Sequence, residues 1–322
     1  MSVVAGCSLF DGVLLAADCR VTVPRRGAPD VHLDCAQKIF PLTPNAAIGF
    51  VGNVRAASML LQWTFRRLPT RQRQDPISLM MWLPRFLRYA YQQLPSNLSS
   101  ESIAFMVASA VPDRCNVIAR KAAVDLMNHI GFGKSAIQRS WIPDILVQIL
   151  GTDPKYKFVA IPGTSMSLLY IMESPSFIPQ QVRPLQFAAI GSGRDSKVEI
   201  AKYHDMVVAG QPGNSFVEST WFRGAIDNFL QESSLDSVGG LLPIAKITRK
   251  GIEALGVRWG FPDEAVEIEL IFDQSRKRWI QRNTSTGKEI VLLYPWEIPI
   301  DDRVSEKFDD FLDAHRRFRG IT

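Results

Sequence analysis

Apolar residues occur in short runs at the start of the chain, and these runs come in pairs. Residues 3–9 and 12–18 form the first pair, with Asp11-Gly12 between them, a dipeptide typical of the turn in an antiparallel hairpin. Residues 38–42 and 46–51 form a second pair. The chain is therefore expected to begin inside a sheet, with its first residues held by neighbouring strands rather than fraying into solvent.

Two segments with helical periodicity follow these strands. Apolar residues recur at helical spacing over 54–68 and 76–94, which predicts two amphipathic helices, and Pro84 is expected to bend the second one. Further helices are expected over 135–150, 197–208, 214–232 and 303–319.

Other apolar runs predict strands in the middle and last third of the chain. Residues 23–30 combine prolines, a glycine and charged side chains, and they indicate an exposed loop. A hairpin formed by 265–272 and 278–294 is expected to turn at Ser285-Thr286-Gly287. The other expected strands are 102–111, 166–172, 185–190 and 241–248.

The order of these elements predicts the fold class. Strands, two helices, strands, two helices and strands again fit an α+β fold of four layers, αββα, with two sheets face to face and helices outside. A doubly wound sheet would need strict alternation of strand and helix. We expect residues 1–256 to form this domain, with an insertion over 112–165. Residues 257–322 are expected to form a C-terminal extension made of a hairpin and a helix.

Composition changes this picture little. The chain has 322 residues, of which 46% are hydrophobic and 21% charged, as in ordinary globular proteins. The net charge of +5 is small for this length, and the basic stretch 66–73 is expected to be a solvated linker rather than a nucleic-acid site. No apolar run approaches the roughly 20 residues of a membrane-spanning helix. Neither nucleic acid nor a membrane is expected as a partner.

The cysteines and histidines form no recognisable metal motif. No CxxC pair is present, and no histidine lies near a cysteine at ligand spacing, so buried, reduced thiols in a cytoplasmic protein are expected. The histidines have no partner arrangement that indicates a metal site or a Ser-His triad. We therefore expect no metal and no organic cofactor. The residues concerned are Cys7, Cys19, Cys35, Cys115, His32, His129, His204 and His315.

The candidate chemistry lies at the N-terminus. A serine hydroxyl is a weak nucleophile until a base takes its proton. If Met1 is removed, Ser2 carries both a hydroxyl and a free α-amine, whose ordinary pKa of roughly 7.7–8.0 suits a base near neutral pH. A lysine close to this amine would keep it neutral, and Lys38 is the candidate. Asp18 is the natural carboxylate to hold that lysine in place.

Several motifs resemble the β subunits of the proteasome and its bacterial relatives. The resemblance covers residues 2–62 and 166–209. In that family the N-terminal residue is the nucleophile, and an aspartate and a lysine on the following strands tune it, roles that the resemblance gives to Ser2, Asp18 and Lys38. The matching motifs are Ser2-Val-Val, Gly12-Val-Leu-Leu-Ala-Ala-Asp18-Cys-Arg20-Val-Thr22, Lys38-Ile-Phe, Gly49-Phe-Val-Gly52-Asn and Ala-Ile-Gly191-Ser192-Gly193.

The resemblance implies further catalytic groups. The backbone N–H of Gly52 would form the oxyanion hole, and Ser192 would support the α-amine. Asp236 matches the start of a later family motif, but Val238 stands where that motif has a serine. The nucleophile also departs from the family pattern, since Ser2 replaces the usual threonine, whose extra methyl restricts its rotamers.

Substrate-binding residues follow from the same resemblance. Thr22 would pair with the substrate backbone, with Arg20 beside it. Phe50 and Val51 would line the pocket for the residue before the scissile bond.

We therefore expect a proteasome-like peptidase that hydrolyses peptides or unfolded proteins within a homo-oligomeric ring, with an ATP-dependent unfoldase as a further partner. Two alternatives stay open: a catalytically inactive structural subunit of the same kind, and a small-molecule amidase or acylase of the N-terminal nucleophile class. For Asp18 and Lys38 taken alone, a purely structural ion pair is a third interpretation.

Overall fold

The computed structural model describes the greater part of the chain, and everything below concerns these residues. They are 2–8, 12–25, 28–69, 76–110, 167–182, 187–191, 242–248, 250–254, 257–260 and 267–298.

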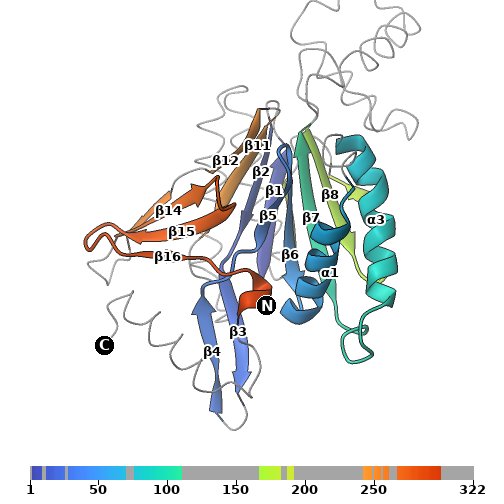
Figure 1. Ribbon diagram of the computed structural model, residues 1–322, viewed down its shortest axis with the longest axis horizontal. Helices are drawn as coiled ribbons and strands as arrows, with labels where there is room; N and C mark the ends of the chain where they lie inside the picture. Colours follow the sequence, from blue (N-terminus) through green and yellow to red (C-terminus); the bar gives the residue numbers. More distant parts are fainter. Residues whose placement is uncertain are drawn as a thin grey trace, which may run out of the picture.

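Two five-stranded antiparallel sheets lie face to face in the centre of the molecule (Figure 1). The first has the order β10 (Phe187–Gly191), β1 (Val3–Ser8), β2 (Val13–Ala17), β11 (Ile244–Thr248) and β12 (Gly251–Ala254). The second has the order β5 (Ile39–Thr43), β6 (Ala46–Gly52), β7 (Ile103–Ala110), β8 (Ser167–Glu173) and β9 (Gln180–Gln181). The predicted hairpins β1–β2 and β5–β6 are both confirmed.

Alternation along the central strands decides which layer each side chain joins. In β7, Phe105 and Val107 belong to the apolar cluster under the helices, whereas Met106 and Ala108 belong to the cluster between the two sheets. Successive side chains of a strand point to opposite faces. A strand with apolar residues at every position is therefore buried on both sides, as the unbroken run of β7 indicates.

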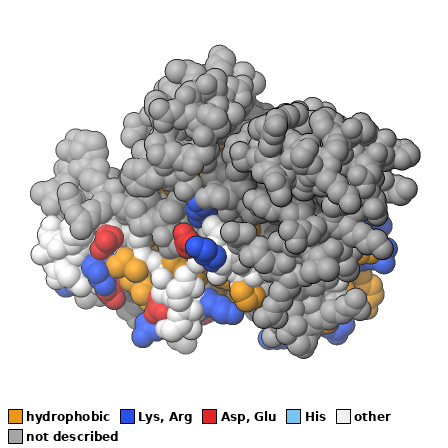
Figure 2. Space-filling model, turned by 90° about the horizontal axis from the view of Figure 1, so that it is seen from above, with side chains coloured by type: hydrophobic (Ala, Val, Ile, Leu, Met, Phe, Trp, Pro, Cys, Tyr) orange, Lys and Arg blue, Asp and Glu red, His pale blue; other side chains and the backbone are white. Residues whose placement is uncertain are grey.

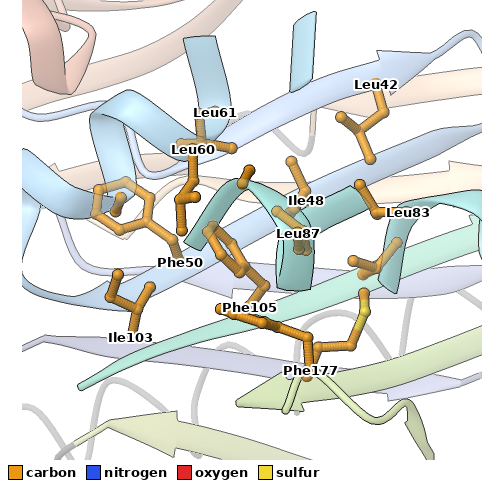
Figure 3. Packing of buried hydrophobic residues seen from close by; sticks show 14 of the residues in the cluster. Leu42, Ile48, Phe50, Leu60, Leu61, Leu83, Leu87, Ile103, Phe105 and Phe177 are labelled. Carbon is orange, nitrogen blue, oxygen red and sulfur yellow. The ribbon is translucent and has the colours of Figure 1, made fainter. Parts of the chain in front are cut away.

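Helices α1 (Val54–Arg67) and α3 (Pro76–Gln92) cover the face of the second sheet that is turned away from the first (Figure 1). Both confirm the periodicity seen in the sequence, and α3 continues through Pro84. Asn53 caps α1 by accepting a hydrogen bond from Ala56 N. Figure 3 shows the packing, in which Leu60 and Leu61 of α1 and Leu83 and Leu87 of α3 meet strand residues. These strand residues include Ile48, Phe50, Ile103 and Phe105.

The predicted four-layer αββα sandwich is wrong. The described residues are 51% strand and form four sheets with only two helices, and both helices lie on the same sheet. The prediction also treated the C-terminal strands as an extension, whereas Ile268, Leu270 and Trp279 from these strands join the apolar cluster between the sheets. The prediction inferred the layers from the order of strands and helices along the chain. That order does not determine which elements a strand packs against.

The loop predicted over 23–30 is also wrong. Strands β3 (Arg20–Arg25) and β4 (Ala28–Asp34) form a two-stranded ribbon that projects from the body of the molecule (Figure 1). The register shifts between Val23 and Arg25, at Pro24. Prolines are tolerated in strands at bulges and edges, where a missing N–H costs no ladder bond.

The C-terminal part of the chain forms a four-stranded sheet, which we call the C-terminal sheet: β13 (Val257–Gly260), β14 (Glu267–Asp273), β15 (Arg278–Asn283) and β16 (Glu289–Val291), followed by a short 3-10 helix, η5 (Pro295–Glu297). The hairpin predicted here exists, but it turns at 274–277; the expected turn at 285–287 instead joins β15 to β16. Turn residues occur in both places, so composition alone could not choose between them.

The helices expected over 135–150, 197–208, 214–232 and 303–319, and the predicted insertion over 112–165, lie outside the described residues. Neither described helix combines the length and the apolar character needed to cross a bilayer. On the face shown in Figure 2, some acidic and basic side chains lie next to each other. In the C-terminal sheet, Arg282 pairs with both Glu289 and Glu269.

Candidate functional site

Ser2 lies at the start of the central strand β1. Val3 is paired with Gly191 of β10, and Val4 with Ala17 of β2, so neighbouring strands hold the chain immediately after Ser2 on both sides. Because side chains alternate along a strand, Ser2 shares a face with Val4, which packs between the two sheets. Ser2 is 8% exposed. Its hydroxyl therefore faces the interior of the molecule.

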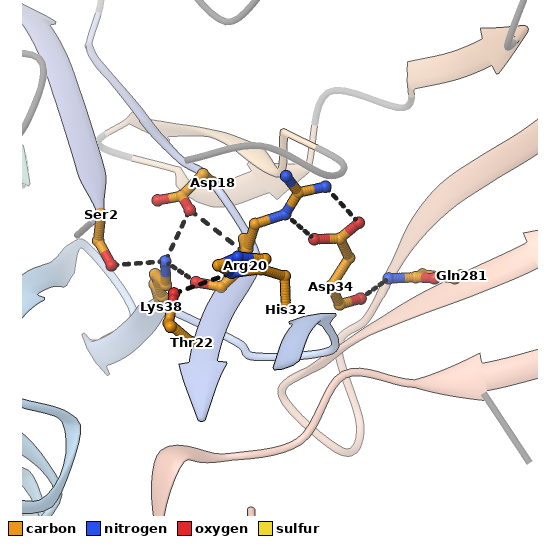
Figure 4. Close-up of polar contacts among 8 residues, drawn as sticks. All are labelled: Ser2, Asp18, Arg20, Thr22, His32, Asp34, Lys38 and Gln281. Carbon is orange, nitrogen blue, oxygen red and sulfur yellow. Dashed lines mark hydrogen bonds and ion pairs between the residues drawn. The ribbon is translucent and has the colours of Figure 1, made fainter. Parts of the chain in front are cut away.

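The ammonium group of Lys38 has all three of its protons directed at oxygen atoms (Figure 4). Nζ donates to Oγ of Ser2 at 2.8 Å, to Oδ2 of Asp18 at 2.8 Å and to the backbone carbonyl of Arg20 at 2.6 Å. The side chains of Lys38 and Asp18 are completely buried. A buried ammonium is tolerable only when it is paired and fully hydrogen-bonded, which this arrangement achieves.

Asp18 connects the lysine to the beginning of the chain. One carboxylate oxygen accepts from Lys38, and the other accepts from the backbone N–H of Val3 at 2.8 Å. Oδ2 also accepts from Arg20 N at 3.3 Å. Burial raises the pKa of the Asp18 carboxyl above its ordinary value, and the charge and hydrogen bond of Lys38 oppose that rise. Asp18 thus fixes both the lysine and the residue that follows Ser2.

Arg20 holds this cluster from the other side. Its guanidinium binds both carboxylate oxygens of Asp34, at 2.7 and 3.1 Å, while its carbonyl accepts from Lys38. The substrate-binding role expected for Arg20 therefore competes with an intramolecular bidentate pair. Thr22, two residues further along β3, lies on the exposed ribbon, where its hydroxyl is 3.1 Å from Nδ1 of His32.

Gly191 brings β10 against the backbone of Ser2. It adopts a φ of +74°, and a Cβ at this position would collide with the carbonyl oxygen of Ser2 and lie 3.1 Å from Val51 Cγ1. Only glycine fits this close approach without strain. The same contact brings Val51, near the end of β6, to the neighbourhood of Ser2.

The two residues expected to line the substrate pocket point in opposite directions. Phe50 packs under the helices against Phe40, with ring centroids 6.1 Å apart, whereas Val51 belongs to the cluster between the sheets. Strand alternation forbids a shared pocket for adjacent residues of β6. Val51 is beside the candidate site, but Phe50 is part of the helix-side core.

Gly52, the expected oxyanion donor, ends β6 one residue after Val51. It has a φ of +104°, and a Cβ there would collide with the carbonyl oxygen of Ser102. The helix cap Asn53 follows at once. The positive φ and the close approach of Ser102 therefore require glycine here, independently of the predicted oxyanion role of its N–H.

Ser192 and Asp236 lie outside the described residues, so their predicted roles stay predictions. Sequence reasoning missed the residues that support the cluster: Asp34, which binds Arg20, and Gln281, which donates to the Asp34 carbonyl at 3.0 Å. Asp34 had one local signal in the sequence, since its carboxylate stands four residues before Lys38. Gln281 carried none.

Comparison with models of protein families and with curated proteins finds no match for this chain. Within the described ranges, no three histidine, cysteine or acidic side chains come together as a metal site would require. The described cysteines, Cys7, Cys19 and Cys35, are buried.

Proposed function

We propose that this chain is an N-terminal nucleophile hydrolase of the proteasome-like peptidase class, with Ser2 as the nucleophile once Met1 is removed. The observation that carries the proposal is the buried contact of 2.8 Å between Lys38 Nζ and Ser2 Oγ. Asp18 binds both Lys38 Nζ and the backbone N–H of Val3, the residue after Ser2. A hydroxyl beside a fixed, fully paired ammonium is polarised towards its alkoxide form.

The donors and acceptors of the cluster determine where each proton lies. The Asp18 carboxylate and the Arg20 carbonyl can only accept, so Lys38 keeps protons directed at both. Its third proton points at Ser2 Oγ, which leaves the α-amine of Ser2 as the group free to act as base. An amine next to a positive charge loses its own proton more readily, which suits that role.

The reaction then runs in two steps. Ser2 Oγ forms a bond to the carbonyl carbon of the substrate amide, its proton passes to the α-amine, and the carbonyl π electrons move to oxygen. Collapse breaks the C–N bond, and the leaving amine takes the proton from the α-ammonium. Water then attacks the acyl ester, the α-amine takes its proton, and that proton returns to Ser2 Oγ as the acid leaves.

Several finer features rest on the resemblance alone. These are the oxyanion role of Gly52, ring assembly, peptide or unfolded-protein substrates and an ATP-dependent unfoldase as partner. The cytoplasmic location is instead proposed from the cysteine pattern. No cofactor takes part in the proposed reaction.

Turnover of fluorogenic peptides, compared with simple acyl amides, tests the proposal. We expect the wild-type chain with an exposed Ser2 to cleave peptides, Ser2→Ala to lose at least about a thousandfold in kcat, and Ser2→Thr to remain active. Ser8→Ala, at the other end of the same strand, is the matched control. Faster turnover of acyl amides than of peptides would favour an amidase. Absence of any turnover from a correctly trimmed protein would favour a structural subunit.

A further inference from the structure

The segment that presents Lys38 belongs to neither central sheet. Residues 35–38 connect β4 to β5, and the chain just after β16 runs beside them. Leu293 donates its N–H to the carbonyl of Cys35, and its own carbonyl accepts from Gln37 N, each at 2.8 Å. Ala36 N also donates to the carbonyl of Cys19 at 3.0 Å, so the C-terminal part of the chain and the start of the chain both provide backbone partners of this segment.

The side chain of Gln37 reinforces that connection. It is fully buried, and its amide nitrogen donates to the carbonyl of Ile39 at 3.0 Å and to that of Lys277 at 3.2 Å. Its amide oxygen accepts from Trp279 N at 3.2 Å. One side chain, immediately before Lys38, therefore joins β5 to the C-terminal sheet through bonds in both directions.

Gln281 makes a second connection, through Asp34. The amide nitrogen of Gln281 donates to the Asp34 carbonyl, the Asp34 carboxylate binds Arg20, and the Arg20 carbonyl accepts from Lys38. Figure 4 shows this row of contacts running from Gln281 to Ser2. Among the described residues, the buried amide oxygen of Gln281 has no hydrogen-bond partner. A methionine would fill the same space without leaving a buried amide oxygen unpaired. The hydrogen bond to Asp34 is therefore the interaction that glutamine adds at this position.

An aromatic contact holds the residues after Lys38. Phe40 packs against Tyr294 and Trp296, with ring centroids 5.5 and 5.9 Å apart. Gln37 on one side of Lys38 and Phe40 on the other are therefore both held by the chain beyond residue 257.

We propose that Gln37 and Gln281 are positioning residues for Lys38, and that the C-terminal sheet is a working part of the hydrolase site rather than an accessory module. The sheet sets the distance between Lys38 Nζ and Ser2 Oγ. This inference rests on the proposed function. Its importance follows from geometry, since a displacement of about 1 Å in a catalytic group can reduce the rate on the order of a hundredfold.

Two substitutions in the full-length protein test the proposal, with one matched control. Gln37→Met and Gln281→Met keep the side-chain volume and remove the bonds to the segment. Asn283→Ala affects the same strand, β15, where Asn283 is buried and accepts from Ser285 N and Thr286 N in the following turn. The measurements are kcat and KM for a fluorogenic peptide, the midpoint of thermal unfolding, and crystal structures of the wild type and Gln37→Met.

We expect each glutamine variant to lose at least about tenfold in kcat with KM unchanged, because the lost interaction acts on the reacting groups and not on substrate binding. Gln281→Met is expected to unfold close to the wild-type temperature. Asn283→Ala is expected to unfold at a lower temperature and to keep kcat within about twofold. Glutamine variants with wild-type kcat, or an Asn283→Ala variant that loses as much kcat as they do, would overturn the proposal.

The crystal structures separate this proposal from the proposed function. We expect the Lys38 Nζ to Ser2 Oγ distance to lengthen beyond hydrogen-bond reach, about 3.2 Å, in Gln37→Met. An unchanged distance of 2.8 Å, the wild-type value, would overturn the positioning role whether or not the wild type turns over. The wild type could also show no turnover while the Lys38–Ser2 distance lengthens in Gln37→Met. That result would contradict the hydrolase function and support the positioning role.

Discussion

The Nζ atom of Lys38 lies 2.8 Å from the Oγ atom of Ser2, although 36 positions separate the two residues in the chain. The remaining protons of Lys38 go to the Asp18 carboxylate and the Arg20 carbonyl, so the ammonium is fixed on three sides. It cannot swing away from Ser2 without leaving buried acceptors unpaired. The positive charge next to the hydroxyl is therefore a permanent feature of the folded chain.

Removal of that charge is the first test. Lys38→Met is expected to lower kcat/KM by about a thousandfold or more, because both the hydroxyl and the α-amine lose the neighbouring ammonium. It also leaves the Asp18 carboxylate buried without its counter-charge, which should cost about 3–5 kcal/mol of unfolding free energy. Peptidase assays and chemical denaturation measure the two effects.

A double variant separates activity from stability at this pair. Lys38→Met with Asp18→Asn removes both buried charges, so we expect it to recover part of the lost stability while staying inactive. Lys250→Met, at an exposed position, is the control. Recovery of turnover in the double variant would show that Lys38 matters only for folding.

The raised pKa of Asp18 predicts an acid limit for activity. Because burial raises that pKa above the ordinary value of 3.8, the carboxylate takes up a proton at a higher pH than an exposed aspartate does. Lys38 then loses its partner, so kcat/KM should fall as the pH drops through this raised pKa, in addition to the fall caused by protonation of the Ser2 α-amine. In Asp18→Asn activity should be low at every pH, and the pH profile should keep only the limb of the α-amine. A second acid limb that persists unchanged in Asp18→Asn would assign it to another group.

The raised pKa of Asp18 affects stability in the opposite direction to activity. Between the pKa of the unfolded chain and the raised pKa of the folded chain, the folded state binds more protons, so the Asp18 contribution to unfolding free energy rises as the pH falls. Activity should therefore disappear on mild acidification while the fold persists. Circular dichroism recorded alongside the activity profile tests this order of events, and simultaneous loss of both would contradict it.

The approach of Gly191 to Ser2 can be tested against a matched glycine. Gly191 and Gly287 have φ values of +74° and +67°, but only Gly191 has a neighbour where a Cβ would be. Both alanine variants should lose about 1–3 kcal/mol through backbone strain. Only Gly191→Ala should also displace Ser2 and reduce kcat, by about a hundredfold. Equal kcat values in the two variants would show that residue 2 needs no support from β10.

Blocking the α-amine distinguishes the two bases near Ser2. Insertion of a glutamate between Met1 and Ser2 prevents exposure of the amine and leaves Lys38 in place. We expect no turnover, since the amine is the only group in the cluster left free to take the serine proton. Intact mass verifies the blocked N-terminus. Turnover near that of the trimmed protein would assign the base role to Lys38.

Part of the fold could be predicted because its signals are local. Asp11-Gly12 between two apolar runs predicts the β1–β2 hairpin, and the spacing of apolar residues over 54–68 predicts α1. The opposite placement of Phe50 and Val51 was also implicit in strand alternation, but family resemblance led us to expect both in one pocket. Where a local rule and a resemblance disagreed, the local rule was right.

The rest depends on contacts between distant parts of the chain. Gln281 and Asp34 are 247 positions apart, and Gln37 and Trp279 are 242 apart. A glutamine has no periodicity or motif that marks it as a partner for one backbone carbonyl. The wrong αββα prediction has the same origin, because only the folded structure shows that C-terminal strands add Trp279 to the cluster between the sheets. Short-range patterns do not contain that information.

Covalent trapping of the N-terminal residue is the most direct test of the central claim. The trimmed protein is treated with a peptide epoxyketone, and the modified residue is mapped by mass spectrometry of its N-terminal peptide. The Ser2 nucleophile and its free amine predict one stoichiometric adduct on Ser2, absent from Ser2→Ala and from the chain with a blocked amine. A trimmed, folded wild-type protein that stays unmodified, or an adduct on another residue, would contradict the account.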